Sequence, residues 1–153
     1  MIKPINMLKN PEQAKILRAK AETVVGMPDH VMQLINDLRD TAASNPLCIG
    51  LASNQIWDQS GLPPAVFVVK TVQGIFAVVN PVVETPWKKE IKDNEGCMSV
   101  PGLKKAVRRP RHLRLSFYDE SGKFNKDMHF FDDIARIIMH EYDHLQGELI
   151  EDK

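Results

Sequence analysis

The sequence is poor in the features that mark specialised classes of protein. Only two cysteines, Cys48 and Cys97, occur among its 153 residues, which excludes the disulfide scaffold of a small secreted domain and favours a reducing compartment. No apolar run approaches the ~18–20 residues that cross a bilayer. The first twenty residues carry charges throughout in place of the apolar segment of a signal peptide. We therefore expect no membrane association and no secretion signal.

A surplus of charge of one sign is also missing, because twenty Lys and Arg residues balance twenty Asp and Glu residues. This neutral total gives no support to a sequence-specific nucleic-acid partner or to a role at a membrane surface. What the chain does have is an ordinary globular composition, with 43% hydrophobic and 26% charged residues. No repeat or linker interrupts it, so we predict a single domain that covers residues 1–153.

The hydrophobic pattern predicts helices near both ends of the chain. A short helical turn is expected around Pro11–Ala21, and apolar residues at helical spacing predict a helix over residues 28–44. Near the C-terminus, Asp132 is a favourable N-cap and Gly147 suits the position that ends a helix. A partly buried helix is therefore predicted over residues 133–146.

The middle of the chain predicts short strands. Two segments rich in β-branched and aromatic residues flank a turn that ends in Gly74, which is the pattern of a β-hairpin. The predicted strands are Ala65–Lys70, Ile75–Val79, Trp87–Lys92, Leu113–Tyr118 and Phe124–Phe131. Strands in the middle and helices toward the ends indicate an α+β fold, not alternating βαβ units.

The predicted C-terminal helix contains the H-E-x-x-H sequence His140-Glu141-Tyr142-Asp143-His144. Histidines at positions i and i+4 lie one turn apart on the same helix face, where both imidazoles can bind one metal ion. Glu141 lies about 100° around the helix axis, where it can accept a proton from a water molecule at that ion. The pattern predicts a metal site with a neighbouring base.

A catalytic metal site usually has three protein ligands and one open position. The sequence offers Cys97, Cys48 and Glu95 as candidates for the third ligand. Cys97 follows a glycine in Glu95–Ser99, and its thiolate would be a strong soft ligand. A further stretch, Cys48–Gln55, is rich in small residues that allow a backbone to approach a substrate, and Gln55 offers an amide donor and acceptor.

Taken together and in this order, the three stretches resemble peptide deformylase, whose pattern is G-x-G-x-A-A-x-Q, then E-G-C-L-S, then H-E-x-D-H. Here they are Cys48–Gln55, Glu95–Ser99 and His140–His144, and the similarity extends from about residue 30 to the end. The resemblance implies antiparallel sheets around a C-terminal helix that carries H-E-x-x-H. It also implies hydrolysis of the N-formyl group from formyl-methionine at the start of nascent polypeptides, with release of formate.

The resemblance also implies the roles of single residues. The ligands of one divalent metal ion would be Cys97, His140 and His144, and that ion would natively be Fe²⁺, with Zn²⁺ or Ni²⁺ as substitutes in the isolated protein. Glu141 would act as general base and then general acid. Gln55 and the backbone N–H of Met98 would form the oxyanion hole. The residues expected to contact substrate are Ile49, Gly50, Leu51, Arg109, Arg136 and Ile137.

The partners implied by the resemblance are formylated nascent peptides, met at the ribosome exit by a monomeric enzyme in the cytoplasm of a bacterium or a phage-infected host. The chain ends nine residues after His144. It therefore resembles the short members of the family that lack a C-terminal extension, such as phage-encoded ones.

Two departures from the family pattern concern the substrate pocket. Arg136, four residues before His140, and Asp93, two residues before Glu95, both replace residues that are usually apolar in the family. A desolvated arginine without a partner is unfavourable. We therefore expect Arg136 either to pair with Asp93 or to reach solvent at the rim of the pocket.

Two other functions stay open on the sequence. One is a binding or regulatory protein that keeps the fold with altered catalysis and shifted specificity. The other is a metallopeptidase built on the same H-E-x-x-H core. The retained Gln55, Cys97 and Glu141 favour the deformylase, and the cysteine ligand argues against the peptidase.

Overall fold

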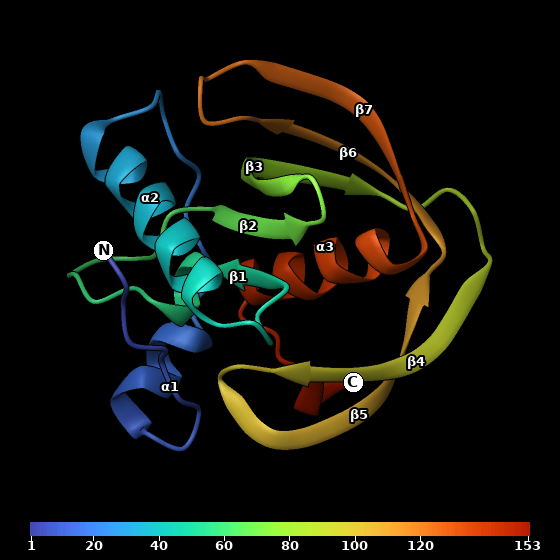
Figure 1. Cartoon of the computed structure of the whole chain (residues 1–153), viewed down its shortest axis with the longest axis horizontal. Coiled ribbons are helices and arrows are strands. Elements are labelled where there is room, and N and C mark those ends of the chain that lie inside the picture. The colour runs from blue at the N-terminus through green and yellow to red at the C-terminus, as the bar shows by residue number, and fades with distance from the viewer.

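The computed structural model describes residues 1–153 and contains three helices, seven strands and two short 3₁₀ turns (Figure 1). The helices are α1 (Pro11–Leu17), α2 (Asp29–Ser44) and α3 (Asp132–Leu145). The strands are β1 (Gly50–Ala52), β2 (Val66–Thr71), β3 (Gly74–Glu84), β4 (Glu90–Cys97), β5 (Val100–Pro110), β6 (His112–Tyr118) and β7 (Phe124–Phe131). None of the helices combines the length and the apolar character that crossing a bilayer requires.

The strands form two separate antiparallel sheets. Five of them are hydrogen-bonded in the order β1-β2-β3-β6-β7, which leaves β1 and β7 as the edge strands. β4 and β5 pair only with each other and form a two-stranded ribbon. This β4–β5 pair, called the ribbon below, crosses the lower part of Figure 1. A two-stranded sheet is marginally stable alone, so the ribbon needs contacts with the rest of the molecule.

β2 is buried on both faces and separates two hydrophobic cores. Successive side chains of a strand point to opposite faces. Val66 and Val68 accordingly belong to the core that α2 covers, whereas Phe67 and Val69 belong to the core that α3 covers. This explains why the segment is continuously apolar and does not alternate.

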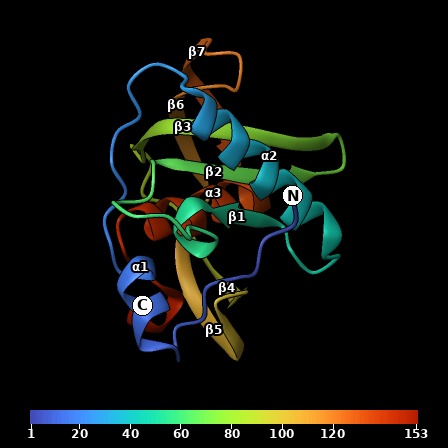
Figure 2. The ribbon, with the colours of Figure 1, turned by 90° about the vertical axis from the view of Figure 1, so that its left-hand side faces the viewer.

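α3 lies between the five-stranded sheet and the ribbon, as the two views in Figures 1 and 2 show. Ala135, Ile138 and Leu145 are buried in the second core beneath the sheet. Glu141 and His144 are also buried, although they are polar. The helix therefore has one face that packs in the core and another that carries buried polar side chains. The second face is the candidate for a functional site.

The predicted α+β class with antiparallel sheets is confirmed, and the strand Phe124–Phe131 has the predicted bounds. Asp132 is not an N-cap: it is the first residue of α3 with φ +52°, and its carboxylate accepts a hydrogen bond from Arg111. The strand expected over Trp87–Lys92 begins later, at Glu90. β1 and β5 were not predicted; β5 is rich in Lys, Arg and Pro, which hides a strand pattern.

Replacing Gly147 with Ala should destabilise the protein more than the same change at Gly26. Both glycines have positive φ, +77° and +69°, which disfavours a side chain by about 1–2 kcal/mol. At Gly147, however, the new Cβ would lie 2.3 Å from the carbonyl oxygen of Arg18, whereas nothing lies within 4 Å of it at Gly26. We expect urea unfolding to show a larger loss for Gly147→Ala. Equal losses would contradict this packing of α1 against the end of α3.

Candidate metal centre and catalytic cavity

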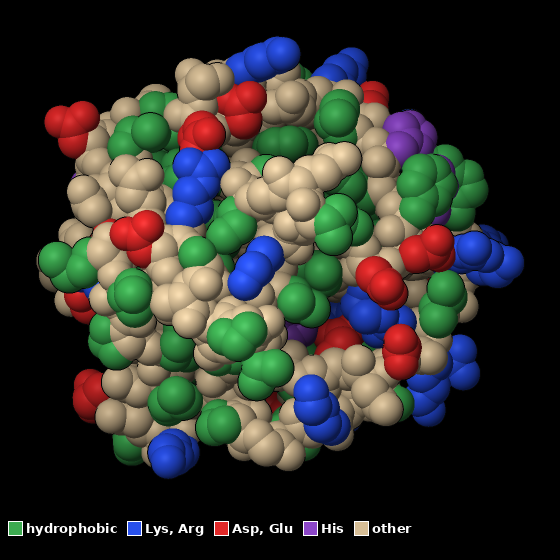
Figure 3. All heavy atoms as spheres, viewed as in Figure 1, with side chains coloured by type: hydrophobic (Ala, Val, Ile, Leu, Met, Phe, Trp, Pro, Cys, Tyr) green, Lys and Arg blue, Asp and Glu red, His purple; other side chains and the backbone are tan.

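A cavity of about 720 Å³ lies between the ribbon, the β1 segment and α3. Its walls come from residues 47–55, residues 93–104 and the face of α3 that carries the histidines. Figure 3 shows a hollow in the middle of this face of the molecule, with histidine, acidic and basic side chains at its bottom. The three sequence stretches that resemble a family pattern thus meet at one place in the fold.

Cys97, His140 and His144 converge in this region. Their candidate ligand atoms all lie within 4.8 Å of one another, and they are the one such group of metal-ligating side chains in the chain. Cys97 is the last residue of β4, before the turn into β5, while the two histidines lie one turn apart on α3. The site is therefore divided between the ribbon and the helix, and it exists only while the two are held together.

The spacing of these three side chains fits a shared metal ion. The Cys97 sulfur and the His144 Nε2 atom are 3.4 Å apart. A sulfur and a nitrogen that bind one tetrahedral metal stand roughly 3.5 Å apart, given bond lengths of about 2.3 and 2.0 Å. One thiolate and two imidazoles form a donor set suited to ions such as Zn²⁺ or ferrous iron. The residues present thus fit the metal that the sequence predicts.

The two histidines are electrostatically different. Although burial lowers it, hydrogen bonding to Cys97 and Glu95 raises the pKa of His140 to about 10. Burial, with the nearby charge of His140, holds the pKa of His144 well below its usual value. His144 is therefore neutral and ready to bind a metal, whereas His140 must release a proton when a metal binds.

Glu95 is the centre of a buried network beside the metal ligands. Its Oε1 atom lies 2.9 Å from Nδ1 of His140, which leaves the Nε2 side of that ring for a metal. Arg109 donates to both oxygens, at 2.8 and 2.9 Å. Although burial alone would raise it, hydrogen bonds from Arg109 and His140 hold the pKa of Glu95 far below its usual range. The carboxylate is therefore ionised and orients the His140 ring.

Arg109 is buried within this network and is not a solvated surface charge. Only 4% of its side chain is exposed, and besides Glu95 it binds Asp143 at 2.5 Å. It does not line the cavity, because its guanidinium binds the carboxylates of Glu95 and Asp143. Leu51, also expected at the substrate, is fully buried in the α2 core. The structure thus gives neither side chain a direct contact with the cavity.

Glu141 is buried in the cavity wall beside Gly50. A Cβ atom at Gly50 would lie 2.5 Å from the Glu141 carboxylate and 2.9 Å from Ile137, so only glycine fits there. Burial raises the pKa of Glu141 to about 7, and its Oε2 atom has no hydrogen-bond partner in the protein. A carboxyl group that titrates near neutral pH is suited both to accept and to donate a proton.

Gln55 directs its amide group toward the ligands. Its Oε1 atom accepts a hydrogen bond from the backbone of Ala52, which fixes the amide. The Nε2 atom then donates toward the Ser99 hydroxyl at 3.2 Å and lies 3.8 Å from the Cys97 sulfur. Met98 lines the same cavity. Ser99 has no assigned role in the sequence prediction, although its place within E-G-C-M-S could have indicated one.

Cys48, the other candidate for a third ligand, lines the cavity but is not part of the ligand group. Its thiol donates to the carbonyl of Gly50 at 3.2 Å. Burial raises the pKa of this thiol to about 11, which disfavours the thiolate that binds metals. The geometry therefore selects Cys97.

Arg136 lines the cavity, but its partner is not Asp93. Its guanidinium binds Glu95 at 2.8 Å and two backbone carbonyls of the ribbon. The Asp93 carboxylate instead accepts from the backbone of Asn94. The expected Arg136–Asp93 pair is therefore wrong, because Glu95 and the carbonyl groups already satisfy the arginine.

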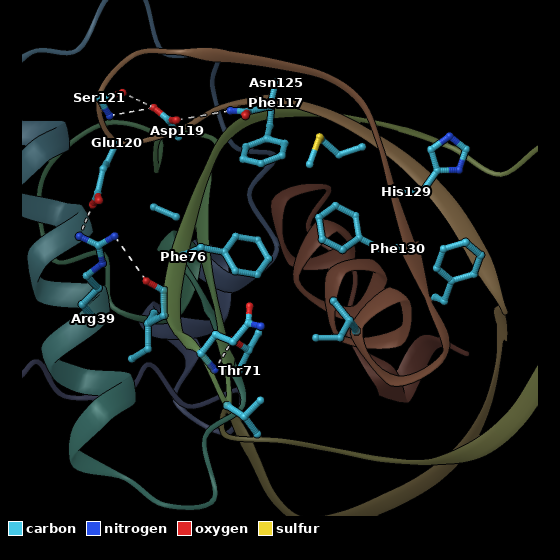
Figure 4. Close-up of a pocket in the computed structure, with 17 residues that line it drawn as sticks. Arg39, Thr71, Phe76, Phe117, Asp119, Glu120, Ser121, Asn125, His129 and Phe130 are labelled. Carbon is cyan, nitrogen blue, oxygen red and sulfur yellow. Dashed lines mark hydrogen bonds and ion pairs between the residues drawn. The ribbon is translucent and has the colours of Figure 1, made fainter.

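A second cavity, of about 840 Å³, lies between the tip of the β2–β3 hairpin, the β6–β7 hairpin and the start of α3 (Figure 4). Phe76, Phe117 and Phe130 line it, while Arg39 and Glu120 at its edge pair with each other. None of the three candidate metal ligands lines this cavity. Two of these ligands and the candidate base instead line the first cavity, between the ribbon, β1 and α3.

Replacing Arg109 with Met should lower the free energy of unfolding by up to about 3–5 kcal/mol, because the buried Glu95 and Asp143 lose the cation that they share and keep Arg136 and Lys153 as separate partners. Arg114→Met is a suitable control, since the side chains of Arg114 and its partner Glu84 are 34% and 52% exposed, and exposed pairs contribute about 0–1 kcal/mol. Chemical denaturation of both variants measures the difference. A loss below 1 kcal/mol for Arg109→Met would show that the network adds little stability.

Comparisons with known proteins identify the family of the chain. The family model described as Polypeptide deformylase matches residues 2–153. A peptide deformylase of Thermoanaerobacter pseudethanolicus is 32% identical over 139 residues, which cover 91% of this chain and 83% of the relative. Peptide deformylase 1 of Clostridium perfringens is 36% identical over 141 residues and 90% of each chain.

Solved structures give the same result. The peptide deformylase of Thermotoga maritima superposes with a TM-score of 0.87 at 25% identity, covering 100% of this chain and 97% of that one. A probable peptide deformylase of Synechococcus phage S-SSM7 gives a TM-score of 0.84 at 28% identity and covers 98% of both chains. The chain therefore belongs to the polypeptide deformylase family of metal-dependent hydrolases.

Proposed function

We propose that this single-domain protein removes the formyl group from formyl-methionine at the N-terminus of nascent peptides, with Cys97, His140 and His144 as the ligands of its metal ion. The observation that carries this assignment is the convergence of these three side chains within 4.8 Å in a cavity that also contains Glu141 and Gln55. The base and the amide donor lie beside the ligands, as hydrolysis of an amide requires.

The metal, when bound, supplies a Lewis acid that activates water and polarises the formyl carbonyl. Glu141 accepts a proton from the attacking water and returns it to the leaving amine. Its burial and its pKa of about 7 suit this double role. The Gln55 amide and the backbone N–H of Met98 hold the formyl oxygen while it becomes negative. Glu95 keeps the His140 ring in place.

The substrate peptide lies against β1 in this proposal. β1 is an edge strand of the five-stranded sheet, so its free backbone groups can pair with an extended peptide. Ile49 and Gly50 lie at this edge of the cavity, and Ile137 and Arg136 form its α3 wall. The absence of a side chain at Gly50 lets the Glu141 carboxylate pack directly against the backbone of this edge.

Arg136 bears on the choice of substrate because it replaces apolar surface in that wall. Burying a methionine-sized side chain contributes about 1.5–3 kcal/mol. We propose that a pocket with a guanidinium in its wall gains less free energy from burying a methionine side chain. Its preference for formyl-methionine over other formylated residues is then correspondingly smaller. The 12% exposure of the Arg136 side chain supports a position at the edge of the pocket.

The nature of the metal and the setting of the enzyme are also part of the proposal. A soft thiolate with two imidazoles supports ferrous iron as the native ion, with Zn²⁺ or Ni²⁺ as substitutes. We further propose a cytoplasmic monomer that acts on peptides as they leave the ribosome. The relatives named above are bacterial and phage proteins, and formyl-methionine is the substrate that this setting supplies.

The proposal is tested by measuring formate release from formyl-Met-Ala-Ser together with the metal content of the purified chain. We expect one metal ion per chain, formate release, and loss of release on chelation. Metal-loaded protein that binds the peptide without releasing formate would be a binding module. Cleavage of internal peptide bonds would identify a peptidase instead.

Replacing Glu141 with Ala should abolish most catalysis and leave the metal in place, because Glu141 is outside the ligand group. Loss of proton transfer typically lowers a rate by ~10²–10⁴-fold. Glu148→Ala is a control on the exposed surface, where Glu148 pairs with Lys153. Near wild-type kcat in metal-loaded Glu141→Ala protein would rule out the proposed base.

Replacing Cys97 with Ala should weaken metal binding strongly, whereas Cys48→Ala should retain the metal. The effect should exceed the roughly 10–100-fold that follows loss of a supporting residue, since a ligand itself is removed. Competition with a chromophoric chelator measures both affinities. If Cys48→Ala emptied the site and Cys97→Ala did not, the third ligand would be Cys48.

A further inference from the structure

We propose that Arg136 is a positioning residue that fixes the ribbon against α3 and so sets the relative placement of Cys97 and the two histidines. The inference rests on the proposed metal site, because its consequence is read in the affinity for the metal. It is separate from the effect of Arg136 on substrate choice, because it is tested by metal binding and not by the rate with different peptides.

The guanidinium of Arg136 spans three acceptors that belong to both strands of the ribbon. Its Nη1 atom donates to Glu95 Oε2 at 2.8 Å and to the carbonyl of Val107 at 2.9 Å. Its Nη2 atom donates to the carbonyl of Ile91 at 2.6 Å. Ile91 and Glu95 are in β4 and Val107 is in β5. One side chain of α3 thus holds both strands.

The ribbon depends on such side-chain contacts because it shares no backbone pairing with the five-stranded sheet. The Arg109–Asp143 pair provides a second connection to α3, on the side nearer the C-terminal end of the helix. Arg136 lies two turns earlier along α3. Together with the Glu95–His140 contact between them, these connections prevent the ribbon from pivoting about one point, and the position of Cys97 at the end of β4 follows from them.

The chemistry of the contacts explains why arginine is needed. Its planar fork presents several N–H groups in fixed directions, which match a carboxylate and two carbonyl groups at once. A lysine keeps the charge but offers a single nitrogen, which cannot reach all three acceptors. Methionine keeps most of the volume and supplies no donor. Comparing the wild type with Arg136→Lys and Arg136→Met therefore separates the effect of the charge from that of the hydrogen-bond geometry.

Glu95 links the contacts of Arg136 to the proposed metal ligands. Its Oε2 atom accepts from Arg136 and Arg109, while its Oε1 atom faces His140. If Arg136 is removed, the carboxylate keeps Arg109 but loses the donor that ties it to the α3 turn before His140. The Glu95–His140 contact is then free to lengthen, and the ribbon is free to move away from the helix at Ile91 and Val107.

The test compares Arg136→Met and Arg136→Lys with a matched control, Arg111→Met. Arg111 pairs with Asp132 at the first residue of α3 and is about half exposed, but it has no contact with Glu95. Each variant is purified without metal. Its Zn²⁺ affinity is measured by chelator competition, and the visible absorption of its Co²⁺ form reports the ligand geometry.

We expect Arg136→Met to bind Zn²⁺ about 10–100-fold more weakly, as is typical when support of a metal ligand is lost, with an altered Co²⁺ spectrum. Arg136→Lys should show a smaller loss, and Arg111→Met should stay within twofold of the wild type. A folded Arg136→Met protein with unchanged affinity and spectrum would overturn the inference. If that variant does not fold, Arg136→Lys decides, and an unchanged affinity there would overturn it.

The same measurements separate this inference from the proposed function. A wild-type chain that binds no stoichiometric metal would contradict the proposed metal site itself. A wild-type chain that binds one ion, together with an Arg136→Met variant that binds it equally well, would contradict only the role of Arg136.

Discussion

The structure depends on the buried carboxylate of Glu95. Four hydrogen bonds converge on its two oxygens, from Arg109, Arg136 and His140. These donors come from β5 and from two successive turns of α3, while Glu95 itself is in β4. One charged group thus connects the ribbon to the helix. A carboxylate can be buried only when its charge is compensated, and the compensation is provided here by the residues that build the site.

This arrangement explains how a small protein can divide its proposed metal site between α3 and a ribbon that lies outside the main sheet. The five-stranded sheet and the hydrophobic core that α3 covers fix this helix and its histidines. The ribbon brings Cys97 but takes no part in that sheet. The polar network around Glu95 therefore holds the Cys97 sulfur beside the two imidazoles, which the hydrophobic cores do not do. It also orients the His140 ring for binding.

The residue pattern predicts much of the site but little of its support. H-E-x-x-H places two histidines and a glutamate by helical spacing alone, and that spacing survives any tertiary arrangement. The resemblance to a family then brings in Cys97 and Gln55. The role of Arg109 and the partner of Arg136 depend on which side chains meet across the ribbon. No local pattern contains that information, and β5 itself carries a strand sequence dominated by charge. Asp93 was a reasonable partner because it and Arg136 both replace usually apolar residues near the same pocket, yet the guanidinium binds Glu95.

The most direct test of this account is hydrogen–deuterium exchange of the amides in Glu95→Gln compared with the wild type. Glutamine keeps the shape of the side chain and removes its charge. If Glu95 holds the ribbon to α3, amides of β4 and β5 should exchange faster in the variant, while those of the paired strands β2 and β3 should keep their protection. Unchanged protection in the ribbon would contradict the account.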